Sequence, residues 1–294
     1  MTIGRFQNGF AGLISKLSFA SLLAATLLIG TTHQVRAQAT ADAVTSCSAT
    51  ISACGCTITK NGVYVVNAAL NSGQGLTGLG DCIDIKAKNV VLNVAGNNIT
   101  GPGTSTGIGI HLLRSANGAF IEGDDTHVTA WNIGMEIDAS NVITDWVETQ
   151  NNTQAGTFLN NTRNVNVNDF STSGNSIYGV WIREGSNNQI NCSNTDNNGK
   201  IGLYVGCHDD ATHGTKCKGF GPSKNNRLFD HTTDDNGEAG IVIDIGNTGN
   251  VIGDFTSSSN GGSFDSIDDN PGCDNDAWLA ASGDYGTTNQ NCIP

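Results

Sequence analysis

The chain carries a recurring short alternation of apolar and polar positions instead of long apolar segments. A four-residue unit of glycine, apolar, any residue and apolar recurs as GIGI at Gly107, GMEI at Gly134, GVWI at Gly179, GLYV at Gly202 and GIVI at Gly240, with a degenerate GTFL at Gly156. Period-two alternation of this length predicts strands of four or five residues. No apolar stripe with a period of 3.6 residues follows the first 37 residues, which argues against a helical solenoid.

A second recurring feature follows each unit, namely an asparagine directly before a short β-prone run. These residues are Asn117, Asn141, Asn164, Asn188, Asn226 and Asn250, at steps of 24, 23, 24, 38 and 24 residues. Polar tracts such as STSGNS, NTDNNG, TTDDNG and TSSSNG close the units, and we expect Gly, Asn and Ser at corners with left-handed backbone. Units this short bury their apolar faces only by stacking on one another. The sequence therefore predicts an all-β parallel β-helix with a period near 23 residues.

The coil GVWIREGSNNQINCSNTDNNG resembles the repeats of secreted right-handed parallel β-helix proteins of the pectate-lyase-like superfamily. The resemblance covers about residues 82–262 and implies a right-handed solenoid with capped ends. Members of this superfamily cleave or epimerise polysaccharides. The expected organisation is a signal peptide at 1–37, an N-terminal cap and first coil at 38–81, β-helix repeats at 82–262 and a C-terminal cap at 263–294.

The N-terminal segment and the net charge together predict an exported, acidic protein. Residues 1–37 combine Arg5 and Lys16 with the apolar run LSFASLLAATLLIG and small residues before the expected cleavage site, the pattern of a secretory signal peptide. Removing Arg5, Lys16 and Arg36 leaves 11 basic against 27 acidic residues, a net charge of −16. We therefore expect a secreted, periplasmic or extracellular monomer that binds neither nucleic acid nor membrane after cleavage.

All nine cysteines lie in the mature part, and in an exported chain they predict disulfides. Cys47, Cys54, Cys56 and Cys82 are expected to form two bridges in the first cap, with the pairing left open. Cys273 and Cys292 are expected to close the C-terminal cap, and both cap patterns look like the ends of secreted β-helix repeat proteins. Cys207 and Cys217 are expected to pair within a loop, which leaves Cys192 as a buried, unpaired thiol.

Aligning the glycine marks predicts two outward rows on one sheet face. The first row holds Gly109, Glu136, Trp181, Tyr204 and Val242, and the second holds His111, Asp138, Arg183, Gly206 and Asp244. Trp181 and Tyr204 on adjacent coils would form an aromatic platform for a sugar ring, or else a ladder that only stabilises the coils. Glu136 and Asp138 are candidate acid and base, with Arg183 nearby, although acidic side chains of such a chain are often only solvated.

The 38-residue step places an insertion of about 14 residues after Tyr204, in GCHDDATHGTKCKGFG. Insertions in solenoids often mark the binding face, so His208 and His213 are candidate substrate-binding residues and Asp209 and Asp210 candidate catalytic acids. The spacing of Cys207 and His208 is poor for zinc. Calcium is possible at Asp209 and Asp210, or in the acidic run 265–276, and no other cofactor is indicated. The loop can equally be an exposed, disulfide-stapled turn.

Three functions remain open from the sequence. The first is a non-catalytic protein that binds a polysaccharide or cell-surface glycan on the outward face beside residues 206–225. The second is a polysaccharide lyase, hydrolase or epimerase that uses the acidic residues and Arg183 on that face. The third is a structural or adhesive extracellular repeat protein without a ligand.

Overall fold

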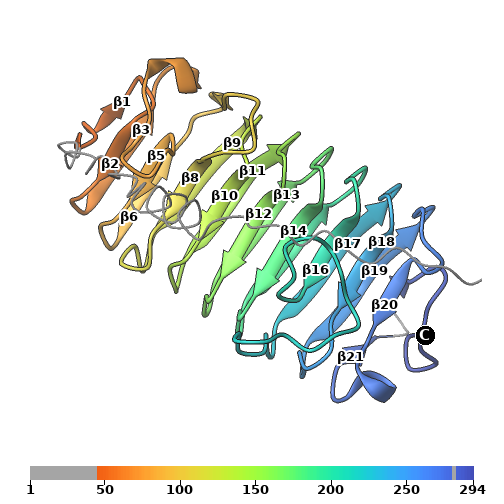
Figure 1. Ribbon diagram of the computed structural model, residues 1–294. Helices are drawn as coiled ribbons and strands as arrows, with labels where there is room; N and C mark the ends of the chain where they lie inside the picture. Colours follow the sequence, from red (N-terminus) through yellow and green to blue (C-terminus); the bar gives the residue numbers. More distant parts are fainter. Residues whose placement is uncertain (1–44, 280–282) are drawn as a thin grey trace, which may run out of the picture. The chain divides into compact units, whose positions relative to one another are not determined.

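The computed structural model describes residues 45–279 and 283–294, and this part of the chain winds into a parallel β-helix (Figure 1). Nine strands, one from each coil, form sheet A, and thirteen strands form sheet B. Every strand pairs in parallel with its counterpart in the next coil, as β14 does with β16. The predicted all-β solenoid is therefore confirmed. The expected signal peptide and the side chain of Cys192 lie outside the described part.

Sheet A consists of β2 (Cys56–Ile58), β5 (Ile83–Ile85), β8 (Ile108–Leu112), β10 (Ile133–Ile137), β12 (Ala155–Asn160), β14 (Tyr178–Arg183), β16 (Ile201–Val205), β18 (Ala239–Ile243) and β20 (Ser266–Asp268). Sheet B consists of β1 (Thr50–Ile51), β3 (Gly62–Val66), β4 (Leu70–Asn71), β6 (Val90–Asn93), β7 (Ile99–Thr100), β9 (Phe120–Thr129), β11 (Ile143–Gln150), β13 (Asn166–Ser171), β15 (Gln189–Asn194), β17 (Arg227–Asp234), β19 (Val251–Ser258), β21 (Ala277–Trp278) and β22 (Gly283–Asp284). Two single-turn 3₁₀ segments, Ser72–Gln74 and Pro271–Cys273, complete the described elements.

The inward side chains of sheet A form a continuous apolar column. One stacked row, with every member fully buried, runs through Ile85, Leu112, Ile137, Leu159, Ile182, Val205 and Ile243. Each such side chain contributes about 1.5–3 kcal/mol through removal from water. Because the column is shared between coils, no coil buries its apolar face alone.

Asparagine side chains tie each coil to the next at a buried corner. The ladder runs through Asn152, Asn175, Asn198, Asn236 and Asn260. Asn198 Oδ1 accepts hydrogen bonds from the backbone N–H and Nδ2 of Asn175 at 3.1 and 3.0 Å, and its Nδ2 donates to Thr172 O at 3.0 Å. A second ladder joins Asn188, Asn226 and Asn250. These ladders explain the predicted period. Asn164 is an exception, because the ladder position in its coil is held by the next residue, Val165, whose backbone N–H donates to Asn188 Oδ1.

The repeated glycines have a different role from the one expected. Most lie inside the strands of sheet A and are not left-handed corner residues. A Cβ on Gly179 would lie 2.6 Å from Gly202 O and 2.8 Å from Nδ2 of the ladder residue Asn198. Glycine is therefore required because the asparagine ladder and the next coil approach it closely.

Disulfides close both ends of the coil stack. Cys47 pairs with Cys56 and Cys54 with Cys82, which gives the connectivity that the sequence left open. Cys273 pairs with Cys292 as predicted. Within the described residues, no helix has the length and apolar character needed to cross a bilayer.

Replacing Asn198 by alanine tests the ladder. The backbone N–H of Asn175 and the carbonyl of Thr172 would lose their partners, and each buried unsatisfied group costs about 1–3 kcal/mol. We expect Asn198→Ala to lower the free energy of unfolding by roughly 3 kcal/mol in urea denaturation. Asn166→Ala, on the outer face of sheet B, is the control and should have little effect; equal losses in the two variants would contradict the ladder's role.

Candidate functional site

The register of sheet A brings together residues that the sequence alignment had separated. His111 pairs with Glu136 on the next strand, and not with Asp138, because the glycine equivalent to Gly134 is Gly109 and not Gly107. Asp84 precedes His111 in the same row. The alignment by GIGI was therefore two residues out of register in this coil. The outward alternation in IDI at 83–85 could have indicated Asp84.

A connected line of polar side chains crosses the outer face of sheet A, and we call it the polar strip: Asp81, His111, Glu136, Asp138, Asn160 and Arg183. His111 Nδ1 lies 2.9 Å from Asp81 Oδ2, and His111 Nε2 lies 3.6 Å from Asp138 Oδ2. Asn160 Nδ2 donates to Asp138 Oδ1 at 2.8 Å and, at 3.4 Å, to Glu136 Oε1. Arg183 Nε and Nη2 both donate to Asn160 Oδ1 at 3.1 Å. Five coils thus contribute side chains to one network.

Burial and charge act in opposite directions on the ionisable groups of the polar strip. Burial alone would lower the pKa of His111, but the carboxylates of Asp138, Asp81 and Glu136 outweigh it and raise that pKa to about 10. Burial also raises the pKa of Glu136, an effect only partly offset by the positive charge of His111. The polar strip therefore holds an imidazolium next to a carboxyl group that takes up a proton more readily than usual.

The aromatic side chains expected to form an open platform lie beneath the insertion. Trp181 and Tyr204 are 1% and 0% exposed, and they stack with Phe158 and Tyr178 in a second apolar cluster outside the coil interior. Trp181 Nε1 donates to Gly206 O at 2.9 Å. The rings do face outward, but the expectation of an exposed platform is wrong because residues 206–225 cover them.

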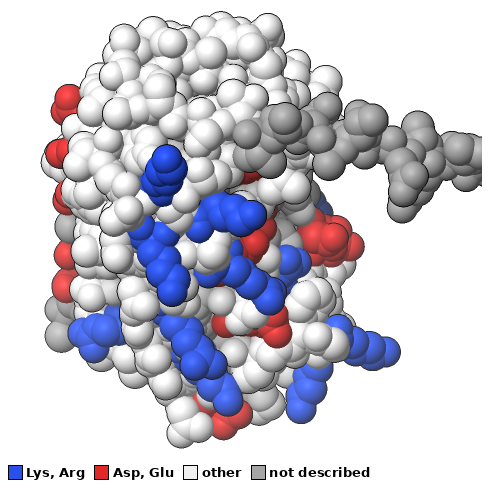
Figure 2. All heavy atoms as spheres, turned by 90° about the vertical axis from the view of Figure 1, so that its left-hand side faces the viewer, with Lys and Arg blue, Asp and Glu red and all other residues white. Residues whose placement is uncertain are grey.

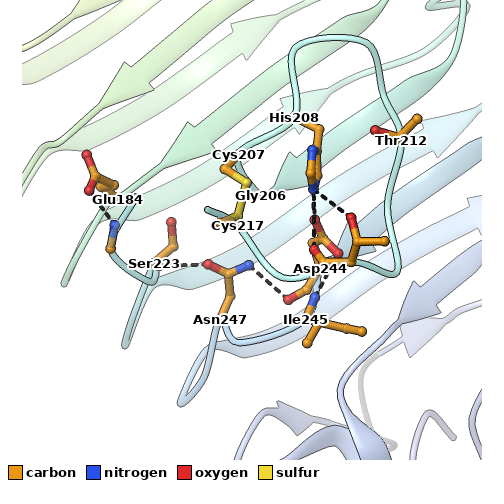
Figure 3. Close-up of a disulfide and its surroundings, with 12 residues drawn as sticks. Glu184, Gly206, Cys207, His208, Thr212, Cys217, Ser223, Asp244, Ile245 and Asn247 are labelled. Atoms are coloured by element: carbon orange, nitrogen blue, oxygen red, sulfur yellow. Dashed lines mark hydrogen bonds and ion pairs between the residues drawn. A yellow bond between two sulfur atoms is a disulfide. The ribbon is translucent and has the colours of Figure 1, made fainter. Parts of the chain in front are cut away.

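Histidines and buried carboxylates fasten this loop to sheet A (Figure 3). Asp244, fully buried after β18, accepts from Gly214 N at 2.8 Å and lies 3.4 Å from His208 Nε2. His213 Nδ1 lies 2.6 Å from Asp269 Oδ2 and its Nε2 3.5 Å from Glu238 Oε1. His208 and His213 thus hold the loop in place.

The loop disulfide is present as predicted, between Cys207 and Cys217. These sulfurs lie near His208 and Asp244, but while they are bonded to each other they do not offer thiolate ligands.

The other acidic candidates do not converge on the polar strip. Asp209 and Asp210 are exposed, and the Asp210 carboxylate accepts from Thr212 N and Oγ1. They follow β16, three coils from Glu136, or about 14 Å at the usual strand spacing. In the run 265–276, Asp265 and Asp268 accept hydrogen bonds from Thr287 and Trp278. Among the described residues, neither segment forms a group of three or more converging ligands.

The loop also contacts the polar strip through Phe220, a residue that the sequence analysis did not select. The guanidinium of Arg183 lies over Phe158, Trp181 and Phe220, 4.7–4.9 Å from the ring centroids. Phe220, from the loop, is 43% exposed. The exposed aromatic surface at this site is therefore Phe220.

Positive charge is concentrated along one edge of the solenoid, which we call the basic edge. Ten of the eleven Lys and Arg residues after residue 37 lie in, or directly beside, the turns that lead from sheet A to sheet B: Lys60, Lys86, Lys88, Arg114, Arg163, Arg183, Lys216, Lys218, Lys224 and Arg227. Figure 2 shows many Lys and Arg side chains on the face turned to the viewer, with some Asp and Glu side chains between them. Among the described residues, no carboxylate lies within 4 Å of these cations as an ion-pair partner. The net charge therefore misrepresents this edge, and it does not exclude an anionic partner.

Comparisons with solved structures show the same fold. The enzymatically active domain of tailspike protein 2 of Bacteriophage CBA120 matches with a TM-score of 0.52 at 14% identity, covering 81% of this chain and 41% of that one. A point mutant of the periplasmic alginate epimerase AlgG matches with a TM-score of 0.51 at 15% identity, covering 71% and 46%. The chain thus spans less than half the length of these structures. No protein-family model and no curated protein sequence matches it. At these identities the likeness defines a parallel β-helix protein.

The His213 contact predicts a pH-dependent loop. Its hydrogen bond to Asp269 raises the pKa of His213 above the ordinary value of 6.5, despite burial. The contact between His213 and Asp269 therefore contributes its full stabilisation of the folded protein below about pH 6.5. This stabilisation is lost as pH rises through the raised pKa of His213. The difference in melting temperature between wild type and His213→Gln should shrink as pH rises from about 6 to 9. His127→Gln, at a part-exposed histidine of sheet B that pairs with Glu148 at 2.8 Å, shows how much pH dependence a histidine pair outside the loop contributes. A His213 difference that does not vary with pH would contradict this assignment.

Proposed function

We propose that this protein binds an anionic polysaccharide along the outer face of sheet A, between the polar strip and the basic edge, beside residues 206–225. The observation that carries the proposal is the segregation of Lys and Arg on the edge where the strands of sheet A end. Coils lie about 4.8 Å apart, so successive turns present cations at intervals of one or two sugar units. The four disulfides support action outside the cytoplasm.

Arg183 is the point where the two parts of this surface meet. It is the last residue of β14, so it belongs to the basic edge and also ends the polar strip. The half-buried carboxylates and the amide of Asn160 offer acceptors and donors for sugar hydroxyls. The exposed ring of Phe220 offers an apolar face next to that guanidinium. Glu136, Asn160 and Arg183 lie on strands of sheet A, and Asp138 directly follows β10.

A second candidate function is cleavage or epimerisation of the bound glycan. It is favoured by the closeness of His111, Glu136 and Asp138, whose potential proton-accepting atoms lie within 4.8 Å of one another. If the reaction is hydrolysis, carboxyl groups this close fit the roughly 5 Å of retaining glycosidases better than the 6.5 Å or more of inverting ones. The tailspike and epimerase structures that share the fold are enzymes by their names.

Binding is tested with a panel of anionic and neutral oligosaccharides. Arg183→Gln should weaken binding of an anionic ligand about tenfold or more, because a charge and two hydrogen bonds to Asn160 are lost together. Phe220→Ala should weaken it less, and added salt should weaken wild-type binding. Lys200→Gln, which changes a lysine away from the basic edge, is the matched control. A preference for neutral glycans, or equal losses in Arg183→Gln and Lys200→Gln, would refute the proposed surface.

Catalysis is tested separately with Glu136→Gln. If wild type releases or epimerises product, this variant should lower turnover at least a hundredfold while ligand affinity changes little, because the amide keeps the shape but neither donates nor accepts a proton as a carboxyl group does. Asp209→Asn is the control, three coils away. Turnover lost in the control but kept in Glu136→Gln would place the chemistry elsewhere, and absence of turnover in wild type would leave binding alone.

A further inference from the structure

A buried cluster of Asp81, Asp84 and His111 lies on the outer side of β5 and β8, where Asp81 and His111 form one end of the polar strip. Asp81 and Asp84 are 2% and 3% exposed, and His111 is 9% exposed. His111 Nδ1 lies 2.9 Å from Asp81 Oδ2 and 3.9 Å from Asp84 Oδ1. Two carboxylates thus face one imidazole nitrogen inside the protein.

This cluster is incompletely satisfied by the protein. Asp81 is held firmly, since its Oδ1 accepts from Ile108 N at 2.8 Å. Asp84 Oδ1 is buried and has no hydrogen-bond partner, and its Oδ2 lies 3.5 Å from Thr57 Oγ1. His111 Nε2 likewise lacks a hydrogen-bond partner. Buried polar atoms are rarely left unpaired, so the open oxygen of Asp84 points to a missing ligand.

We propose that Asp81, Asp84 and His111 bind a divalent transition-metal ion, of which zinc and manganese are the best candidates. For bonds of about 2.1 Å in tetrahedral geometry, neighbouring ligand atoms lie about 3.4 Å apart. The observed 2.9 and 3.9 Å bracket that separation, so side-chain shifts of about half an ångström complete the site. One imidazole with two carboxylates suits these ions, whereas calcium takes six to eight oxygens, more than this cluster offers.

Such an ion would act as a positioning centre for the polar strip. Binding at Nδ1 would displace the proton that the neighbouring carboxylates otherwise hold on this imidazole, so ion binding releases a proton. The ion would then fix the ring of His111 and leave Nε2, which faces Asp138 at 3.6 Å, as the free edge of the imidazole. It also joins β5 and β8, the second and third strands of sheet A. The inference rests on the buried cluster and does not depend on the proposed glycan binding.

The test uses oxidised, tag-free mature protein, freed of metal with a chelator and then titrated with Zn²⁺, Mn²⁺ or Ca²⁺ by calorimetry. We expect one Zn²⁺ or Mn²⁺ per chain, a higher melting temperature in the loaded protein, and at least tenfold weaker binding in Asp84→Asn. Asp244→Asn is the matched control, because Asp244 is also a buried carboxylate beside a histidine but both its oxygens are hydrogen-bonded. Binding unchanged in Asp84→Asn, calcium preferred to zinc and manganese, or no ion bound by wild type would overturn the proposal.

X-ray absorption of the zinc-loaded wild type keeps the proposal testable if Asp84→Asn does not fold. We expect one imidazole nitrogen and carboxylate oxygens around the ion, without sulfur. Sulfur ligands would instead identify the region of Cys207 and Cys217 after loss of its disulfide and would refute the site at His111.

Discussion

The hydrogen bonding of each coil to the next is the constraint on which the rest of this structure depends. The backbone of a parallel coil, and the asparagines at its corner, find most of their partners in the neighbouring coil, as Asn175 does in Asn198. This fixes the register of every strand and so the outward neighbours of each side chain. It also explains why the strands of sheet A carry glycine where the asparagine ladder passes. The polar strip is thus a product of register, since its members come from five coils.

The same constraint explains why the insertion after β16 does not disturb the solenoid. The ladder continues from Asn198 to Asn236 across 38 residues, so the extra chain leaves the coil and returns in register. Outside the coil, the loop covers Trp181 and Tyr204. The buried carboxylate of Asp244 holds the loop by accepting a hydrogen bond from Gly214 N. The loop thereby converts an exposed aromatic row into a second core and presents Phe220 over Arg183.

Local alternation was enough to predict the period and the all-β solenoid. Cysteine positions were enough to predict a first cap with two disulfides and the pairs Cys207–Cys217 and Cys273–Cys292. Register could not be predicted to the residue, since glycines two apart, Gly107 and Gly109, both fit the same short motif. That ambiguity separated His111 from Glu136 and concealed the cluster with Asp84. The burial of Trp181 could not be predicted either, because it depends on how the loop at residues 206–225 folds back over sheet A. Net charge is limited for a similar reason, since it carries no information on where charges gather.

Together, the polar strip, the basic edge and Phe220 form the surface on which we propose that an anionic glycan binds, with Glu136, Asn160 and Arg183 at or near the ends of β10, β12 and β14. The most direct test is a crystal structure of the protein with an anionic oligosaccharide that it binds in solution. The account predicts sugar density over sheet A between His111 and Arg183, with the ligand's acidic groups directed to the basic edge and residues 206–225 still covering Trp181. Sugar bound on sheet B, or stacked on Trp181 and Tyr204 beneath a displaced loop, would contradict it.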